Sequence, residues 1–210
     1  MWDAALGLNR AAAAVSRKGR GLPPLLFFID PARTPRPWET AAQLPAGAAV
    51  VYRHFGAPDR EAIARRLRSA TAKQGVTLLI GLDAGLADRV GADGVHLPER
   101  ALSAAWALGG KRPDWLLIGA VHSMEAARRA RDLDALVLSP VFPAGGGSAI
   151  RPALGAEAFA AIVASIDLPV YALGGIGRDT IGALSGTGAC GIAGVEAVQR
   201  AFGGKAGFRI

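Results

Sequence analysis

Cysteine is almost absent from this sequence: Cys190 is the only one among 210 residues. A single thiol cannot form a disulfide within the chain, and no zinc-binding Cys/His spacing accompanies it. No apolar run approaches the roughly 20 residues that a membrane-spanning helix needs. The short apolar run at residues 11–15 precedes a basic segment, whereas a signal peptide has the opposite order. We therefore expect a cytoplasmic protein without a membrane partner.

Aromatic residues are also scarce, at 6% of the chain, even though the formal net charge is +7. The most basic segment has four arginines within residues 60–68, mostly on the outer face of one predicted helix, and no aromatic residue lies among them. Nucleic-acid-binding proteins more often place such charge beside aromatic residues or a reading motif. The sequence therefore predicts no nucleic-acid partner, and its charge favours small anionic ligands.

Eight short apolar segments, rich in Val, Leu and Ile, alternate with segments of helical periodicity. The predicted strands are residues 25–29, 48–53, 77–81, 94–97, 116–122, 136–140, 170–174 and 191–195. The predicted helices include residues 59–73, 123–131, 155–165 and 180–185, and the first two begin at Asp59 and Ser123. Several strands are apolar throughout, as expected for parallel strands that are covered on both faces. Strands and helices that alternate in this way form a parallel sheet with right-handed crossovers.

The length of the chain suits one buried core, so we predict the α/β fold class and a single (β/α)8 TIM barrel. Residues 1–22 are predicted to be an N-terminal extension, whose extra helix covers the lower end of the barrel, and residues 23–210 to be the barrel itself. The alternative is an open doubly wound sheet. No G-x-G-x-x-G motif follows the first strand, where a dinucleotide-binding sheet would carry it. Closure into a barrel is therefore favoured.

All three histidines of the chain, His54, His96 and His122, fall at predicted strand ends, where such a barrel builds its site. They come from three separate strands and have no HxH or HxxxH spacing, so we predict no metal site. His96 is expected to be a structural residue, hydrogen-bonded near the rim of the barrel. His122 ends an apolar strand just before a helix, and an imidazole there suits general acid–base catalysis.

Glycines close the last two predicted strands, as Gly174-Gly175 and as Gly194-Val195. Glycines at such ends let backbone N–H groups point at an anion. The loops after strands seven and eight are also the common phosphate site of this fold. We therefore predict a phosphate site there. A glycine run within residues 144–148 is predicted to be either a lid over the site or a simple connector.

Three motifs, taken in order, resemble one protein family. Residues 91–97 read GADGVHL, residues 121–123 read VHS, and PVFP at 140–143 is followed by LGGI at 173–176. Together they resemble the thiamine phosphate synthase/TenI family, over nearly the whole chain. The resemblance implies a role in thiamine biosynthesis and a small phosphorylated thiazole-type ligand.

The TenI branch of this family supplies the first functional hypothesis. TenI-type members tautomerise a thiazole carboxylate phosphate with the histidine that corresponds to His122, and this implies that no metal or other cofactor is needed. The residues expected to contact the substrate are Arg53, Ser123, Ser139 and Phe142. Those expected at the phosphate are Gly174, Gly175, Val195 and Glu196, the last in place of the family's serine.

The synthase branch supplies the second hypothesis. Thiamine phosphate synthase joins a hydroxymethylpyrimidine diphosphate to thiazole phosphate with Mg²⁺, which Asp83 and Glu99 would hold here. This sequence keeps Arg53 of the family's Gln-x-Arg-x-Lys motif, whereas its Asn-Asp pair aligns with residues 81–82 and its Thr-Lys loop with residues 144–147. A third hypothesis is a non-catalytic or regulatory barrel that binds a phosphorylated ligand. The oligomeric state is left open, with a homodimer as one alternative.

Overall fold

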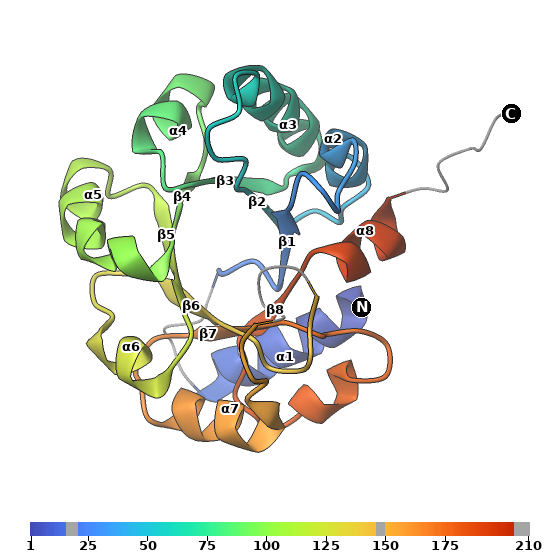
Figure 1. Ribbon diagram of the computed structural model, residues 1–210, viewed down its shortest axis with the longest axis vertical. Helices are drawn as coiled ribbons and strands as arrows, with labels where there is room; N and C mark the ends of the chain where they lie inside the picture. Colours follow the sequence, from blue (N-terminus) through green and yellow to red (C-terminus); the bar gives the residue numbers. More distant parts are fainter. Residues whose placement is uncertain (16–20, 146–149, 204–210) are drawn as a thin grey trace, which may run out of the picture.

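The computed structural model describes residues 1–15, 21–145 and 150–203. Within them, eight parallel strands form a closed barrel in which each strand pairs with its neighbours in the chain (Figure 1). The strands are β1 Leu25–Ile29, β2 Ala49–Tyr52, β3 Thr77–Gly81, β4 Gly94–Leu97, β5 Leu116–Val121, β6 Ala135–Leu138, β7 Val170–Leu173 and β8 Gly191–Gly194. β8 pairs with β1, with Leu26 opposite Ala193, and this pairing closes the sheet. The predicted barrel is therefore confirmed, and the open sheet is wrong.

Alternate residues of each strand face opposite sides of the barrel wall. In β1, Leu26 and Phe28 belong to the hydrophobic cluster inside the barrel. Leu25, Phe27 and Ile29 belong to the outer cluster, which lies between the strands and the helices. All five side chains are buried. Burial on both sides of the wall explains why the strands are apolar throughout rather than alternating.

Helices surround the barrel (Figure 1). They are α2 Pro37–Ala41, α3 Arg60–Gln74, α4 Ala84–Val90, α5 Ala105–Lys111, α6 Met124–Arg129, α7 Gly155–Ala164 and α8 Glu196–Phe202, with the 3-10 segments η2 Glu99–Ala104 and η4 Ile181–Leu184. The helix predicted over 180–185 is the short 3-10 turn η4, because Gly182 disfavours a regular α-helix there. Asp59 precedes α3, but its side chain makes no capping hydrogen bond. No helix in the described part of the chain is long and apolar enough to cross a membrane.

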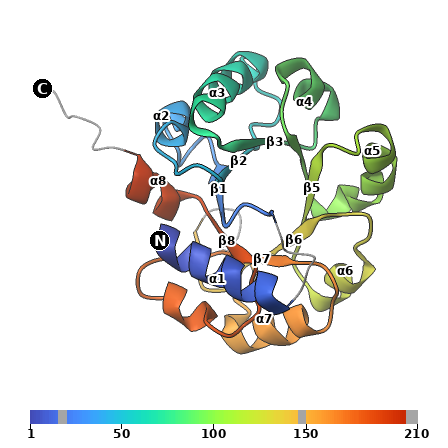
Figure 2. The same cartoon turned by 180° about the vertical axis from the view of Figure 1, so that it is seen from behind.

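The extra N-terminal helix is α1, Trp2–Val15. Figure 2 shows it lying across the barrel beside β8, which it contacts. The Asn9 side-chain amide donates to the carbonyl oxygens of Leu22, at 3.3 Å, and Cys190, at 2.9 Å. These two residues precede β1 and β8, so α1 covers the end of the barrel where the strands begin. The opposite end, where the strands finish, is left for a site.

Candidate active site

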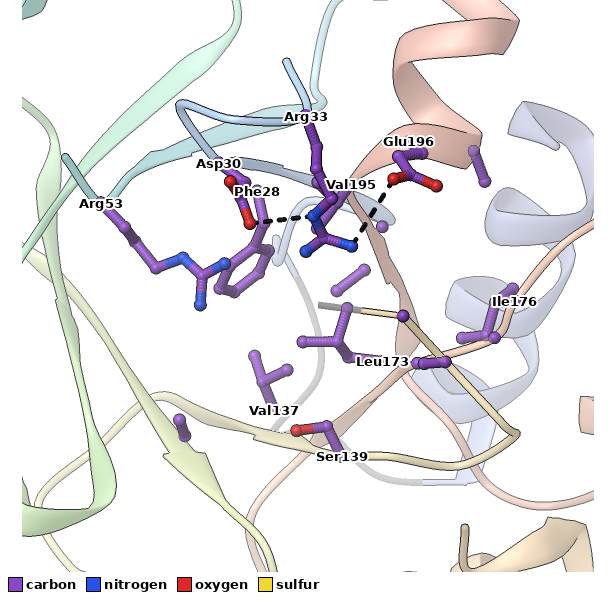
Figure 3. Close-up of a pocket in the computed structure, with 18 of the residues that line it drawn as sticks. Phe28, Asp30, Arg33, Arg53, Val137, Ser139, Leu173, Ile176, Val195 and Glu196 are labelled. Atoms are coloured by element: carbon purple, nitrogen blue, oxygen red, sulfur yellow. Dashed lines mark hydrogen bonds and ion pairs between the residues drawn. The ribbon is translucent and has the colours of Figure 1, made fainter. Parts of the chain in front are cut away.

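A cleft of about 630 Å³ opens at the end of the barrel where the strands finish. The residues that follow the strands line it: Asp30 after β1, Arg53 after β2, Glu99 after β4, His122 after β5, Ser139 after β6, Gly174 and Gly175 after β7, and Val195 and Glu196 after β8. Figure 3 shows Asp30, Arg53 and Glu196 along one side of the cleft and Ser139 on the other. Most of the residues predicted for the site are therefore brought together.

Three residues of the sequence-based hypotheses, Ser123, Phe142 and Asp83, do not line this cleft. The Ser123 hydroxyl oxygen accepts a hydrogen bond from a backbone N–H in the first turn of α6. Phe142 packs against the hydrophobic core. Asp83 caps α4 by accepting from the N–H of Leu86, at 2.8 Å, and it also accepts from Arg60, at 2.6 Å. A hydroxyl or carboxylate just before a helix satisfies its first N–H groups, and both polar side chains are used in this way.

His122 is held by one residue that follows β6 and one that follows β4. Its Nδ1 lies 2.8 Å from the carbonyl oxygen of Ser139 and 3.2 Å from the Ser139 hydroxyl oxygen. Since a carbonyl oxygen can only accept, a neutral His122 carries its proton on Nδ1 and leaves Nε2 free to accept a proton. The backbone N–H of His122 donates to Glu99 Oε2 at 2.8 Å. Glu99 is therefore a positioning residue for His122.

His96 lies at the floor of the same cleft and is only 3% exposed. Its ring stands edge-on to Phe28, with 5.0 Å between the ring centroids, and the guanidinium of Arg53 lies 4.7 Å from the centroid of that phenyl ring. Among the residues that the structure describes, neither ring nitrogen of His96 has a hydrogen-bond partner. The expectation of a hydrogen-bonded structural histidine is therefore wrong. Burial, helped by the charge of Arg53, lowers the pKa of His96 to about 3, so its imidazole is neutral.

The depressed pKa of His96 predicts an acid-sensitive fold. Below about pH 6.5 the unfolded chain binds a proton on this histidine, whereas the folded chain does so only near pH 3. The free energy of unfolding should therefore fall between pH 6.5 and pH 3, by up to about 1.4 kcal/mol per pH unit from this group. Urea denaturation between pH 4 and pH 7 should show a shallower slope in His96→Gln than in the wild type. A His54→Gln variant is the control, and equal slopes in the two variants would contradict the prediction.

Two carboxylates of the cleft, Asp30 and Glu196, are paired with arginines. Asp30 accepts from Arg33 Nε at 2.9 Å, and Figure 3 shows Arg33 placed between Asp30 and Glu196. Burial alone would raise the pKa of Asp30, but the hydrogen bonds from Arg33 and a backbone N–H outweigh it, and the pKa lies below its ordinary value. Glu196 lies 3.8 Å from Arg33 and 3.7 Å from Arg200. An acid at the predicted phosphate site is therefore balanced by two arginines.

The loop after β7 has a shape that only glycine allows. Gly174 and Gly175 have φ angles of 103° and 62°, and a Cβ on Gly175 would lie 2.7 Å from the Cβ of Phe142. The hydroxyl of Thr180 closes the loop, since it accepts from the N–H of Gly177 and donates to the Gly175 carbonyl. Across the cleft wall, no side chain caps the first turn of α8, whose first N–H groups have no acceptor within the helix. These two loops present backbone groups to the cleft.

The two carboxylates that the synthase hypothesis assigns to magnesium, Asp83 and Glu99, are not brought together in the cleft. In the described part of the chain, no three His, Cys, Asp or Glu side chains are grouped as metal ligands. Asp83, the first ligand of the synthase hypothesis, caps α4 and pairs with Arg60 outside the cleft. Glu99, the second, accepts from His122. Mg²⁺ is usually held by one or two carboxylates together with substrate phosphates, and here Asp83 accepts from Arg60 and a backbone N–H, and Glu99 from a backbone N–H.

Sequence reasoning misses three arginines that line the cleft, Arg33, Arg100 and Arg200. The sequence spacing could have indicated two of them, because Arg33 follows Asp30 by three residues and Arg200 follows Glu196 by four. Opposite charges at these spacings face each other on a helical turn. Arg100 directly follows Glu99 in η2, and no sequence pattern marks it.

Comparisons with known proteins identify the family. The family model described as thiamine monophosphate synthase matches residues 32–198. The chain is 34% identical, over 142 residues, to a putative thiamine-phosphate synthase 2 of Aquifex aeolicus, and the match covers 66% of this chain and 75% of that protein. It is 37% identical, over 142 residues, to a putative thiamine-phosphate synthase of Geobacter sulfurreducens, and the match covers 65% of each. The structure of thiamine phosphate pyrophosphorylase from Pyrococcus furiosus superposes with a TM-score of 0.72 at 27% identity, covering 89% of this chain and 94% of that one.

The matched segment 32–198 contains the GADGVHL, VHS and GGI motifs, so the resemblance indicated by these motifs is confirmed. It includes β2 to β8 of the barrel and most of the residues that line the cleft. The chain belongs to the thiamine monophosphate synthase family of enzymes.

Proposed function

We propose that the protein binds a phosphorylated thiazole and moves a proton within it by general acid–base catalysis, with His122 as the catalytic residue and no metal ion. The observation that carries this proposal is the hydrogen bond between His122 Nδ1 and the carbonyl oxygen of Ser139. It leaves Nε2 of the neutral imidazole without a proton, as a general base requires. This chemistry is that of the TenI-like tautomerase expected from the sequence.

Two anchors would hold the substrate beside His122. The loops after β7 and β8 offer backbone N–H groups to the phosphate, at Gly175 and Val195. Arg53, elsewhere in the cleft, has a buried Nε atom without a hydrogen-bond partner among the described residues, and its guanidinium would bind the carboxylate of the thiazole. Two fixed anions leave the ring little freedom to rotate, which favours transfer of one particular proton.

The proton transfer is balanced within the substrate. Nε2 of His122 accepts a proton from one ring carbon, and the electron pair of that C–H bond moves into the ring. The imidazolium then returns the proton to a second carbon, so that the product is an isomer. Glu99 accepts from the backbone N–H of His122 and so holds this residue in place during both steps.

Thiamine phosphate synthase is the second candidate, and the names of the Aquifex, Geobacter and Pyrococcus relatives favour it. By family resemblance, that reaction needs Mg²⁺ and releases diphosphate. Incubation with thiazole phosphate and the pyrimidine diphosphate, with Mg²⁺ or with EDTA, separates the candidates. Diphosphate release that depends on Mg²⁺ would establish a synthase, whereas isomerisation of thiazole carboxylate phosphate in EDTA would establish a tautomerase. Tight binding without either reaction would support the non-catalytic role.

Gly177→Asp is expected to weaken the binding of thiazole phosphate by about tenfold or more, because it places a carboxylate beside the proposed phosphate site. Gly177 lines the cleft, and a Cβ there meets no atom within 4 Å, so the variant should fold. Calorimetric titration without metal measures the change. Gly182→Asp is the matched control, since it has the same charge and the same free space but lies outside the cleft. Equal affinities of the two variants would contradict this placement of the phosphate.

A further inference from the structure

A second cleft, of about 520 Å³, adjoins the candidate active site on the side of β4 and β5. It is lined by residues of η2 and α6 and by Arg151. Glu99, Arg100, His122 and Arg151 line both clefts, so the two are continuous. Arg129 lines the second cleft and not the first. His122, the proposed catalytic residue, therefore lies where the two clefts meet.

The charge of the second cleft is strongly positive. Arg100, Arg129 and Arg151 line it, against the single carboxylate of Glu99, which accepts from the backbone N–H of His122. Within the described residues, Arg100 and Arg151 take part in no ion pair. Arg129 pairs with Glu125 at 3.0 Å, but the two side chains are 72% and 77% exposed, and such a pair is weak and easily exchanged. Arginines held together in this way repel one another unless an anion lies between them.

The rest of the wall is apolar. Leu102, Ala126 and Ala130 line the cleft beside the arginines, and the two alanines are buried. Guanidinium groups bind phosphate oxygens through paired N–H donors, whereas a cation would find only Glu99.

We propose that this second cleft is a metal-independent binding site for a phosphate or diphosphate group, held by Arg100, Arg129 and Arg151. The group is either free in solution or part of the ligand whose other end lies in the active site. An anion here lies next to His122, the residue proposed to transfer the proton. The site is assigned from its own residues and does not depend on which candidate reaction is correct.

Calorimetric titration with inorganic pyrophosphate in EDTA tests the proposal. The wild type should bind pyrophosphate, and Arg129→Ala should bind it at least about tenfold more weakly. Arg128→Ala is the matched control, because Arg128 is also exposed on α6 and its loss changes the net charge equally, but it lines neither cleft. Glu125→Gln, which removes the competing carboxylate, should bind as tightly as the wild type or more tightly. Equal affinities of the Arg129 and Arg128 variants would overturn the proposal.

Two further titrations separate the source of the anion and the two proposals. If a ligand supplies it, Arg129→Ala weakens the binding of thiazole phosphate or of the pyrimidine diphosphate, measured in EDTA. If the anion is free, both ligands bind the variant normally, and pyrophosphate binds together with either. Gly177→Asp should weaken the binding of thiazole phosphate but should not change the binding of pyrophosphate in the second cleft. Loss of pyrophosphate binding in Gly177→Asp but not in Arg129→Ala would overturn the second site and leave the proposed phosphate site standing.

Discussion

Replacement of His122 by asparagine should lower kcat for isomerisation of the thiazole carboxylate phosphate by roughly 10²- to 10⁴-fold, the range for loss of a general acid–base group. The Asn side-chain amide can still donate toward the Ser139 carbonyl oxygen, which accepts from Nδ1 in the wild type. It has no atom that can accept and return a proton near neutral pH. The dissociation constant of the ligand should therefore change little, because the phosphate and carboxylate anchors remain. Single-turnover NMR of the ligand, in EDTA, measures both quantities.

His54→Asn is the matched control. His54 also follows a strand, but it does not line the cleft, and its ring contacts that of Tyr52 with 6.2 Å between centroids. This variant should keep the turnover of the wild type. Undiminished isomerisation by His122→Asn would exclude His122 as the catalytic residue. A loss of binding in that variant, with turnover unchanged at saturation, would make the histidine a binding residue only.

The barrel was predictable because its strands are buried on both faces. Residues 25–29 and 77–81 are apolar runs of strand length, and the strands begin and end at those residues. The fifth strand was expected to include His122, but it ends at Val121, because the His122 backbone N–H turns to Glu99. Short helices such as α2 and α8 have too few turns for a clear periodicity, so sequence patterns alone did not indicate them.

The site was partly predictable because parallel strands deliver their last residues to one end of the barrel. That rule places Arg53, Ser139 and Glu196 in the cleft, where the structure has them. It fails for Asp83, because a polar side chain before a helix has a second use as a cap, and the sequence cannot tell which use wins. The environment of His96 could not be predicted either, because whether its ring meets a hydrogen-bond partner among the described residues depends on which side chains meet inside the barrel.

The GADGVHL motif includes a glycine that the barrel itself requires. Gly94 pairs with Leu116 of β5, and a Cβ on Gly94 would overlap the Leu116 carbonyl oxygen and lie 2.7 Å from its nitrogen. These are backbone atoms of the neighbouring strand, so they cannot move away without breaking the β4–β5 pairing. Gly94→Ala should therefore lower the free energy of unfolding by about 3 kcal/mol or more, at the upper end for an added methyl group. Urea denaturation, extrapolated to water, measures the loss.

Gly110→Ala is the control for that experiment. Gly110 lies in α5, and a Cβ there meets no atom within 4 Å, so alanine should stabilise the protein by about 0.5–1 kcal/mol. If the free energy of unfolding of Gly94→Ala lies within about 1 kcal/mol of the wild-type value, the prediction is wrong and the two strands tolerate a wider spacing. The effect should extend to the site, because His96 and Glu99 follow Gly94 by two and five residues. Where Gly94→Ala still folds, a displaced β4 should move the Glu99 carboxylate away from His122 and lower kcat, whereas Gly110→Ala should leave kcat unchanged.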